Sequence, residues 1–288
     1  MKQGWLIINA YLKSEKFQEI YDYLIEAANK KQCNLKILTN EEILTELPEL
    51  LIEKPDFAIF WDKDVKAAKY MEKNNIQIFN SSQAIEVCDD KALTYLSLLD
   101  AGIKMPKTIV GPLTFGLEAD MEKFIDSAIK NINLPFIIKE SQGSFGAQVY
   151  MAKSKEEAMG IVEKIKGRGF IVQEYVDTSY GKDIRINMVA DKPVASMLRE
   201  NKNDFRANVT NGGSMKKYEP DEEQIEMART VCNTLKLDFA GVDIMFGKSG
   251  EPVFCEVNSN AHFKNIYDCT GVNVADYILE YILEKISL

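Results

Sequence analysis

The sequence predicts an α+β protein whose N-terminal part is a small α/β layer. Within residues 1–88, short apolar runs alternate with segments of helical periodicity, as in "WLIINA", "SEKFQEIYDYLIEAANKK" and "NLKILT", and again in "PDFAIFW", "KDVKAAKYMEKNN" and "IQIFN". Strands that alternate with helices in this way favour a parallel sheet. The first strand is not followed by G-x-G-x-x-G, so the layer is not typical of a dinucleotide-binding domain.

Caps and turns divide the rest of the chain into further elements. A helix begins with Asp89 or Asp90 as its N-cap and ends with Gly102 at C′, shortly before Pro106. Short connections then indicate compact lobes. The predicted elements are, in order, a strand from residue 107, a helix over 119–130, strands over 134–140 and 147–152, a helix over 154–166, a strand over 169–174, a hairpin over 183–199, a helix over 221–236, two strands between 240 and 258, and a closing helix over 272–285.

Composition argues against several classes of protein. The 288 residues are enough for two or three domains. No apolar run approaches the roughly 18 residues that a membrane helix needs, and the first run, which ends at Asn9, is typical of a strand rather than of a signal peptide. The formal net charge of −9 argues against a nucleic-acid surface, which needs clustered Lys and Arg. The five cysteines are scattered without a CxxC pair, which favours reduced thiols in the cytoplasm and argues against zinc.

The segment "AGVDIMFGKSGEPVFCEVNSN", residues 240–260, has the pattern of a β-hairpin. A two-residue turn at Ser249 and Gly250 pairs Lys248 with Glu251 and sets the register of the strands. Alternate pairs along that register are all apolar, which supports it. These pairs are Val242 with Val257, Ile244 with Cys255, and Phe246 with Val253.

The opposite face of this hairpin carries oxygen ligands. Asp243 lies directly across from Glu256, and Asn258 follows two residues along on the same face. Two adjacent carboxylates repel each other unless a cation lies between them. Mg²⁺ prefers carboxylate and amide oxygens, with water and phosphate completing its octahedron. The pattern therefore predicts a Mg²⁺ site, and the alternative is a solvated polar face.

The stretch "IKESQGSFGAQVY", residues 137–149, is predicted to be a strand, a tight turn and a second strand. Lys139 lies at the end of the first strand, and the backbone N–H groups of Gly143, Ser144, Phe145 and Gly146 could cover phosphates. The lysine comes before the glycines, so the order differs from a P-loop and is closer to the glycine-rich cover of kinases. The alternative is an ordinary hairpin turn.

Further cations are spread along the chain. Lys91 lies in the first turn of a helix, which is unfavourable for the helix dipole and leaves room for an anionic partner. Arg199 and Arg206 belong to a small set of arginines suited to clamping phosphate or carboxylate, with surface salt bridges as the alternative. In "KDIRINM" the side chains of residues 183, 185 and 187 share one face of a strand. The lone His262 excludes a metal site built from several histidines.

Taken together, these motifs resemble the ATP-grasp superfamily, and within it the RimK-like glutamate ligases. The resemblance rests on the order DK, IKE-GSxG, QEYV, KDIR, FRAN, GVDI and EVNSN, and it extends over nearly the whole chain. It implies an ATP-grasp fold in three parts: an N-terminal α/β domain over 1–88, a central lobe over 89–174 and a C-terminal lobe over 175–288. ATP would lie between the second and third parts.

The resemblance also implies roles for single residues. It assigns phosphate binding to Lys91 and Lys139 beneath the turn formed by Gly143, Ser144, Phe145 and Gly146. It assigns adenine recognition to Glu174 and Tyr175, and the edge of the nucleotide site to Asp183. The residues that would line the reacting centre are Arg199, Arg206 and Asn208. The ligands of two Mg²⁺ ions, for which Mn²⁺ could substitute, would be Asp243, Glu256 and Asn258.

The implied reaction is ATP-dependent ligation of a carboxylate to an amine through an acyl phosphate. The amine would be glutamate or another amino acid, and the acceptor a small-molecule, peptide or protein carboxylate; no nucleic acid or membrane partner is expected, and a homo-oligomer stays open. Asn211 stands where the family commonly has a basic residue, so the preference for glutamate is expected to be relaxed. Two alternatives remain: a maturase that cross-links a ribosomal peptide, and a nucleotide-binding regulatory protein without turnover.

Overall fold

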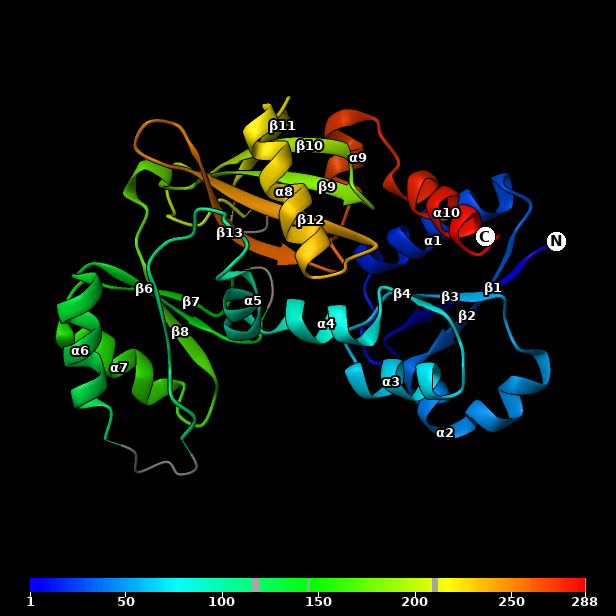
Figure 1. The fold of residues 1–288 in the computed structure, drawn as a ribbon, viewed down its shortest axis with the longest axis horizontal. Coiled ribbons are helices and arrows are strands. Elements are labelled where there is room, and N and C mark those ends of the chain that lie inside the picture. The colour runs from blue at the N-terminus through cyan, green and yellow to red at the C-terminus, as the bar shows by residue number, and fades with distance from the viewer. Residues whose placement is uncertain (115–119, 144–145, 209–211, 288) are drawn as a thin grey trace.

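The structure is a computed structural model that describes residues 1–114, 120–143, 146–208 and 212–287. In these ranges the strands form three sheets, each with its own layer of helices (Figure 1). The sheets follow one another along the chain. This arrangement agrees with the α+β class expected from the sequence.

The N-terminal sheet is parallel throughout, as predicted. Its strand order is β2-β1-β3-β4, and each neighbouring pair is parallel. Helices α2 and α3 pack on one face and α1 on the other, which produces two apolar cores from strands that are buried on both sides. The elements are β1 (Gln3–Ile8), α1 (Glu15–Lys30), β2 (Asn34–Thr39), α2 (Asn40–Leu50), β3 (Phe57–Phe60), α3 (Val65–Lys73) and β4 (Ile78–Phe79).

The central lobe is an antiparallel sheet with two helices packed on one face. Its order is β5-β8-β6-β7, and α6 and α7 cover a core of aliphatic and aromatic side chains. Where both bounds of an element were predicted, the observed element begins and ends within three residues of them. They are β5 (Thr108–Val110), α6 (Glu122–Ile132), β6 (Phe136–Glu140), β7 (Val149–Ala152), α7 (Lys155–Lys164) and β8 (Phe170–Glu174).

The C-terminal lobe contains the second antiparallel sheet, in the order β11-β10-β9-β12-β13. Helix α8 packs on its apolar face, and the opposite face carries the polar residues of β9, β12 and β13. The short strand β11 was not predicted, because "SMKK" has no apolar alternation. The elements are β9 (Lys182–Val189), β10 (Lys192–Glu200), β11 (Ser214–Lys217), α8 (Glu222–Thr234), β12 (Phe239–Phe246) and β13 (Pro252–Asn258).

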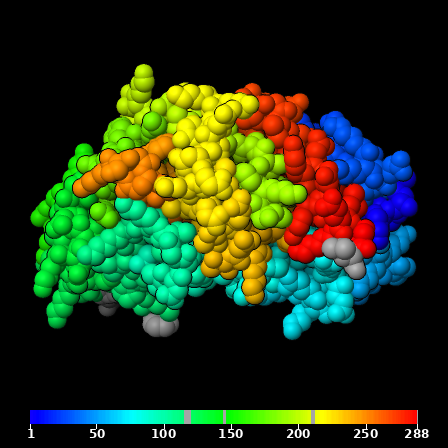
Figure 2. Space-filling view, turned by 45° about the horizontal axis from the view of Figure 1, so that its top comes forward, coloured from blue at the N-terminus to red at the C-terminus, as the bar shows by residue number. Residues whose placement is uncertain are grey.

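The last two helices return to the N-terminal sheet. Helices α9 (Lys264–Thr270) and α10 (Val274–Lys285) share one apolar core with α1 and with the edge of the C-terminal sheet. Figure 2 shows the red C-terminal segment lying directly against the blue N-terminal domain. Because this core crosses from the first part of the chain to the third, the division at residues 88 and 174 stays a prediction.

The helix predicted to begin at Asp89 or Asp90 is shorter than expected. Asp90 is the N-cap of α5 (Lys91–Leu98), and its carboxylate accepts the N–H groups of Ala92 and Leu93 at 2.8 and 3.1 Å. The helix ends before Gly102 because the Ala101 N–H bonds the carbonyl of Leu98 at 3.1 Å, which tightens the last turn. A separate helix, α4 (Ser82–Asp89), precedes it and was not predicted.

The register of the β12–β13 hairpin corrects half of the prediction. Asp243 faces Glu256 and Val242 faces Val257, as expected, but a bulge follows and Ile244 pairs with Phe254 rather than with Cys255. Phe246 likewise pairs with Pro252 instead of Val253. The loop is also one residue longer than assumed, since Gly247 and Glu251 still bond each other at 2.8 Å. The longer loop and the bulge offset each other, which is why the two carboxylates remain opposite.

Candidate active site

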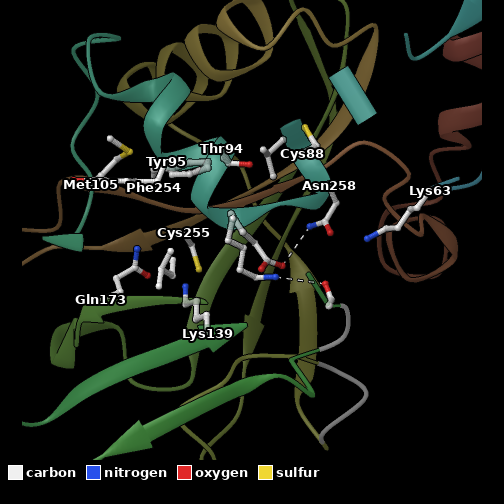
Figure 3. A pocket seen from close by; sticks show the side chains of 15 residues that line it. Lys63, Cys88, Thr94, Tyr95, Met105, Lys139, Gln173, Phe254, Cys255 and Asn258 are labelled. Atoms are coloured by element: carbon white, nitrogen blue, oxygen red, sulfur yellow. Dashed lines mark hydrogen bonds between the residues drawn. The ribbon is translucent and has the colours of Figure 1, made fainter. Parts of the chain in front are cut away.

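Two clefts meet where the central and C-terminal lobes face each other. One cleft lies beside α5 and is shown in Figure 3; the other lies between β6, β8 and the polar face of β9, β10 and β12. Four residues line both clefts: Lys139, Gln173, Cys255 and Glu256. A ligand that extends from one cleft into the other must pass this junction.

Two lysines supply positive charge to the cleft of Figure 3. Lys139, labelled in Figure 3, enters from β6 and is only 7% exposed. Lys91 lines the same cleft from the first turn of α5. The Lys91 ammonium lies 3.5 Å from the carbonyl oxygen of Gly143, and its backbone N–H bonds the Ser141 carbonyl at 2.9 Å. Burial lowers the pKa of Lys91, whereas the charge of Glu256 opposes that shift. The structure therefore brings together the two lysines for which phosphate binding was predicted.

The glycine turn lies beside these lysines. Gly143 and Gly146 have φ values of +149° and +71°, a region that side chains other than hydrogen rarely occupy. An added Cβ at Gly143 would lie 2.5 Å from Oε1 of Gln148, and one at Gly146 would lie 2.8 Å from Oδ1 of Asn208. Ser144 and Phe145 lie outside the described residues. Both glycines are therefore in close contact with neighbouring side chains of the protein, and the role of the turn as a phosphate cover stays a prediction.

The second cleft has an apolar wall that could hold a planar base. Ile137, Val149, Val176 and Met245 line it from three strands and a connecting segment. Tyr175 lines the same cleft, and burial raises its pKa, so the phenol is neutral and adds an aromatic surface.

The side chain of Glu174 is hydrogen-bonded within the protein and is not free to contact adenine. Its carboxylate accepts the backbone N–H of Lys107 at 3.2 Å, and its own N–H bonds the Lys107 carbonyl at 2.8 Å. The side chain is therefore engaged by the neighbouring strand β5. The adenine role predicted for Glu174 is better suited to the backbone that follows it than to its carboxylate.

Arg206 and Asn208 lie directly against the glycine turn at Gly146. The Arg206 guanidinium bonds the Gly146 carbonyl at 2.8 Å and pairs with Asp204 at 2.6 Å. Asn208 lines the cleft beside it. The structure thus places both at the predicted centre, and Arg206 connects the C-terminal lobe to the central lobe there. Asn211 lies outside the described residues.

Arg199 and the two predicted aspartates form a buried ionic network. Arg199 bonds both oxygens of Asp183, at 2.6 and 2.7 Å, and also one oxygen of Asp243 at 2.8 Å. Arg185, which the sequence had placed only on a common strand face, bonds both oxygens of Asp243 at 2.7 Å each. Burial is the largest influence on the Asp243 pKa and would raise it, but the two guanidinium groups outweigh it and lower that pKa.

This network changes the expected role of Asp183. Both of its oxygens are occupied by a single guanidinium, and the pair is almost completely buried at the floor of the cleft. Asp183 is therefore placed to hold Arg199 rather than to offer its carboxylate to a nucleotide. Removing either partner of such a pair leaves an uncompensated buried charge.

The predicted Mg²⁺ ligands are near one another but not equivalent. The Asn258 side-chain amide donates to Glu256 at 3.3 Å, so one amide oxygen and one carboxylate face the same cleft. Asp243 keeps few lone pairs for a metal, because both of its oxygens already accept bonds from arginines. The described residues contain no group of three His, Cys, Asp or Glu side chains suited to a metal. The donor set fits Mg²⁺ bound by one carboxylate, an amide and phosphates.

Three residues that line the clefts were missed as candidates by sequence reasoning. Lys63 follows strand β3, forms an ion pair with Asp89, and points toward the cleft from the N-terminal side (Figure 3). Its position after a parallel strand was the available signal, since ligands bind at the carboxyl ends of such strands. Gln173 and Cys255 offered no pattern of their own, and only the three-dimensional arrangement brings them to the junction.

A family model for the RimK-like ATP-grasp domain matches residues 88–282 of this sequence. The chain belongs to the RimK-like ATP-grasp family. This confirms the resemblance on which the predicted roles were based. Among the described residues of this ATP-grasp protein, no helix combines the length and the apolar character needed to cross a bilayer.

Two relatives indicate the range of the family. The chain is 29% identical over 253 residues to human N-acetylaspartylglutamate synthase A, and the match covers 87% of this chain and 63% of that protein. It is 33% identical over 207 residues to a probable alpha-L-glutamate ligase of Vibrio atlanticus (strain LGP32), and that match covers 70% of this chain and 66% of that protein. The chain thus spans less than two thirds of the length of either relative, and it is homologous to ATP-dependent ligases that form carbon–nitrogen bonds.

A solved structure confirms the fold. The D-alanine–D-alanine ligase from Bacillus anthracis, complexed with ATP, superposes with a TM-score of 0.74 at 17% sequence identity and covers 99% of this chain and 97% of that one. The α+β ATP-grasp fold expected from the sequence is therefore correct.

Proposed function

We propose that this protein is an ATP-dependent carboxylate–amine ligase that forms an amide bond through an acyl phosphate. The observation that supports this most is the junction of the two clefts, where Lys139 and Glu256 line both. The apolar cleft suits the base of ATP, and the lysine-rich cleft suits the acyl group that is phosphorylated. ATP is needed because a carboxylate at neutral pH is a poor electrophile.

The reaction would proceed in two displacements. An oxygen of the acceptor carboxylate attacks the γ-phosphorus, and the bond to ADP breaks, which gives an acyl phosphate and ADP. The amine then attacks the acyl carbon, inorganic phosphate leaves with its electron pair, and the amine loses one proton to water or to the departing phosphate. Both steps develop negative charge on phosphoryl oxygens, so preorganised cations are the main contribution expected from the protein.

Each side chain has a distinct part in this scheme. Lys91 and Lys139 would hold phosphate oxygens, and Arg206 would hold the turn that covers them. Arg199, fixed by Asp183, would stabilise the charge that develops at the floor of the cleft. Glu256 and Asn258 would hold Mg²⁺, which in ligases of this family is used with ATP and supplies further neutralisation of phosphate charge.

The expected substrates are inferred from the relatives and not from the shape of the clefts. The relatives carry synthase and ligase names that refer to glutamate, so glutamate is the first amine to examine. Other amino acids should also be tested as the amine, because Asn211 replaces the basic residue that is common at that position in the family. The acceptor is a carboxylate on a small molecule, peptide or protein.

The test is a screen for ADP release over amino acids combined with carboxylate acceptors, followed by mass analysis of the products. We expect release to need Mg²⁺ and both substrates. Glu256→Gln and Asn258→Ala should each lower turnover by about a hundredfold or more, because the first removes the negative charge of a ligand and the second removes an oxygen ligand. Glu251→Gln is the matched control, since Glu251 is paired with Lys104 at the tip of the hairpin.

Two results would contradict the proposal. Full activity in both cleft variants would remove the metal assignment. ATP binding without ADP release for every substrate pair would favour a nucleotide-binding regulatory protein. A product that is a cross-linked peptide would instead identify a maturase that uses the same acyl-phosphate chemistry.

A further inference from the structure

Lys63 brings a positive charge of the N-terminal domain into the cleft beside α5. It follows β3 in a parallel sheet whose strand order is β2-β1-β3-β4. The chain turns from β1 to β2 on one side and continues to β3 and β4 on the other, so the strand order reverses direction between β1 and β3. Ligands of open parallel sheets bind outside the carboxyl ends of the strands at such a point. Lys63 therefore lies where the topology favours a ligand.

The segment around Lys63 is fixed on both sides. The Asp62 carboxylate accepts the side-chain amide of Asn9, which follows β1, at 3.1 and 3.3 Å. The Asp62 carbonyl accepts the side-chain amide of Asn260, which follows β13, at 2.8 Å. Asp64 then caps the N-terminus of α3. Lys63 thus projects from a segment that is bonded to the N-terminal sheet and to the C-terminal lobe, which gives it the support that a ligand-binding side chain needs.

The ammonium of Lys63 is held at the cleft by an ion pair with Asp89, the last residue of α4. An ammonium has three N–H donors, so this ion pair is compatible with a further bond to a ligand. Figure 3 shows the side chain pointing toward Asn258, which lines the same cleft. Burial lowers the pKa of Lys91, and the charges of Lys139 and Lys63 lower it further, so both of these ammonium groups lie within electrostatic range of Lys91.

Lys63 and the wall proposed for the base of ATP belong to different clefts. Lys63 lines the cleft beside α5, whereas the apolar wall that includes Ile137 and Met245 lines the other cleft. Lys139 and Glu256 line both, so phosphate bound by them lies at the junction. An acid that occupies the cleft beside α5 therefore meets phosphate at the junction and Lys63 on the wall that the N-terminal domain contributes.

The range of the family match supports a role for Lys63 other than nucleotide binding. The family model matches residues 88–282, which include Lys91, Lys139 and Glu256, and Lys63 precedes that range. ATP is the reactant that ligases of this family share, whereas the products named for its members differ. A residue before the shared domain is thus suited to the reactant that varies.

Charge in this cleft favours an acid over an amino acid. Lys63, Lys91 and Lys139 all line it, and Glu256 is the one carboxylate among its described lining residues. Even with Asp89 counted, ammonium groups outnumber carboxylates there. Such surroundings repel the ammonium group of a free amino acid and attract a carboxylate. The acid is therefore the substrate that this cleft suits.

We propose that Lys63 binds a carboxylate of the acid substrate and thereby selects this substrate at the end of the cleft that the N-terminal domain forms. This rests on the proposed ligase function and identifies the part of the site that recognises the acid. The carboxylate is either the one that is phosphorylated or a second one on the same molecule. The two sources share one chemistry, and the experiment separates them.

The test measures binding without turnover. Calorimetric titration, with Mg²⁺ and an ATP analogue that cannot transfer its γ-phosphoryl group, gives the affinity for succinate, glutarate and adipate, for the monomethyl and dimethyl esters of each diacid, and for L-glutamate. We expect saturable binding of at least one diacid. Lys63→Met should weaken that binding about tenfold, as expected for the loss of one charge-assisted contact, and Lys63→Arg should restore most of it. No binding of any of the three diacids, or unchanged affinity in Lys63→Met, overturns the proposal.

Comparison of the probes identifies the group that Lys63 binds. An equal loss of affinity for the diacid and its monoester in Lys63→Met assigns Lys63 to the carboxylate that is phosphorylated, and a loss for the diacid alone assigns it to a second carboxylate. An equal loss for the uncharged dimethyl ester overturns the proposal. A loss confined to L-glutamate, which would indicate the amine donor, or to the ATP analogue, which would indicate phosphate, overturns it as well.

Two further variants separate the charge of Lys63 from the structural role of its ion pair. Lys69→Met is the matched control, because Lys69 pairs with Glu86 at 2.6 Å and so also joins α3 to α4, but at exposed positions; it should leave the affinity for the diacid unchanged. Asp89→Asn removes the ion pair and keeps the charge of Lys63, so it should change this affinity by less than about fivefold. Equal losses in Asp89→Asn and Lys63→Met would make Lys63 structural and overturn the proposal.

The screen for ADP release is independent of these titrations. If the protein forms an amide but Lys63→Met leaves the affinity for the diacid unchanged, this site is rejected and the ligase function stands. If the diacid binds with the expected dependence on Lys63 and no substrate pair releases ADP, the site is supported and the ligase function is rejected.

Discussion

Replacing Asn80 with alanine should weaken the contact between the N-terminal domain and the strands that carry the proposed metal ligands. Asn80 is 1% exposed and follows β4. Its amide nitrogen donates to the carbonyls of Phe239 and Ser259 at 2.9 and 3.0 Å. Its amide oxygen accepts the N–H groups of Asp238 and Phe239 at 2.6 and 3.3 Å. One side chain thus joins the N-terminal sheet to the start of β12 and the end of β13.

The magnitude follows from these contacts. A net contribution of about 1 kcal/mol for each hydrogen bond, with one of the four long, and an added penalty for buried backbone groups left unpaired, gives a loss of about 3–5 kcal/mol. That is a large fraction of the roughly 5–15 kcal/mol by which domains are stable. Asn80→Asp should cost a similar amount, since a carboxylate cannot donate to the two carbonyls and repels them.

The assay is urea unfolding followed by circular dichroism, with ADP release measured on the same preparations. Because Ser259 follows Asn258, a proposed Mg²⁺ ligand, kcat should fall more than the affinity for ATP. Asn74→Ala is the control, since Asn74 is the half-buried C-cap of α3 and its side chain bonds only the Tyr70 carbonyl, at 2.9 Å, among the contacts described. That change should stay within about 0.5 kcal/mol of the natural protein. A loss below about 1 kcal/mol in Asn80→Ala would refute the reasoning.

Two further predictions concern the glycine turn and pH. Gly146→Val should weaken ATP affinity at least about tenfold, because the positive φ at this position strains valine and the added Cβ would lie 2.8 Å from Asn208. Calorimetric titration with ATP measures this affinity. Gly160→Val is the control, since Gly160 is exposed and has open space around an added Cβ. Unchanged affinity would make the turn structural only. The free energy of unfolding should fall as the pH drops from about 6.5 toward 4, by up to about 1.4 kcal/mol per pH unit. The reason is that the pKa of His262 is about 4 in the folded chain, so the unfolded chain takes up the proton first. Urea unfolding at pH 7, 6 and 5 (about the ordinary histidine range) tests this, and an equal slope in His262→Gln would contradict it.

The sequence was most informative where chemistry depends on local spacing. Asp90 as a cap follows from the preference of aspartate for the start of a helix. The parallel layer and the pairing of Asp243 with Glu256 follow from periods of two or of 3.6 residues. The pairing was nevertheless obtained with a loop one residue too short and no bulge. A bulge has no reliable residue signature, so its position had to come from the packing of β13 against its neighbours.

The partners of long charged side chains could not be obtained in this way. Arg185 and Asp243 are 58 positions apart, and their contact depends on β9 and β12 being neighbours in the sheet. The sequence placed both on polar strand faces but could not specify which strands pair. It consequently assigned Asp243 to a metal alone, whereas the structure shows its carboxylate held by two arginines.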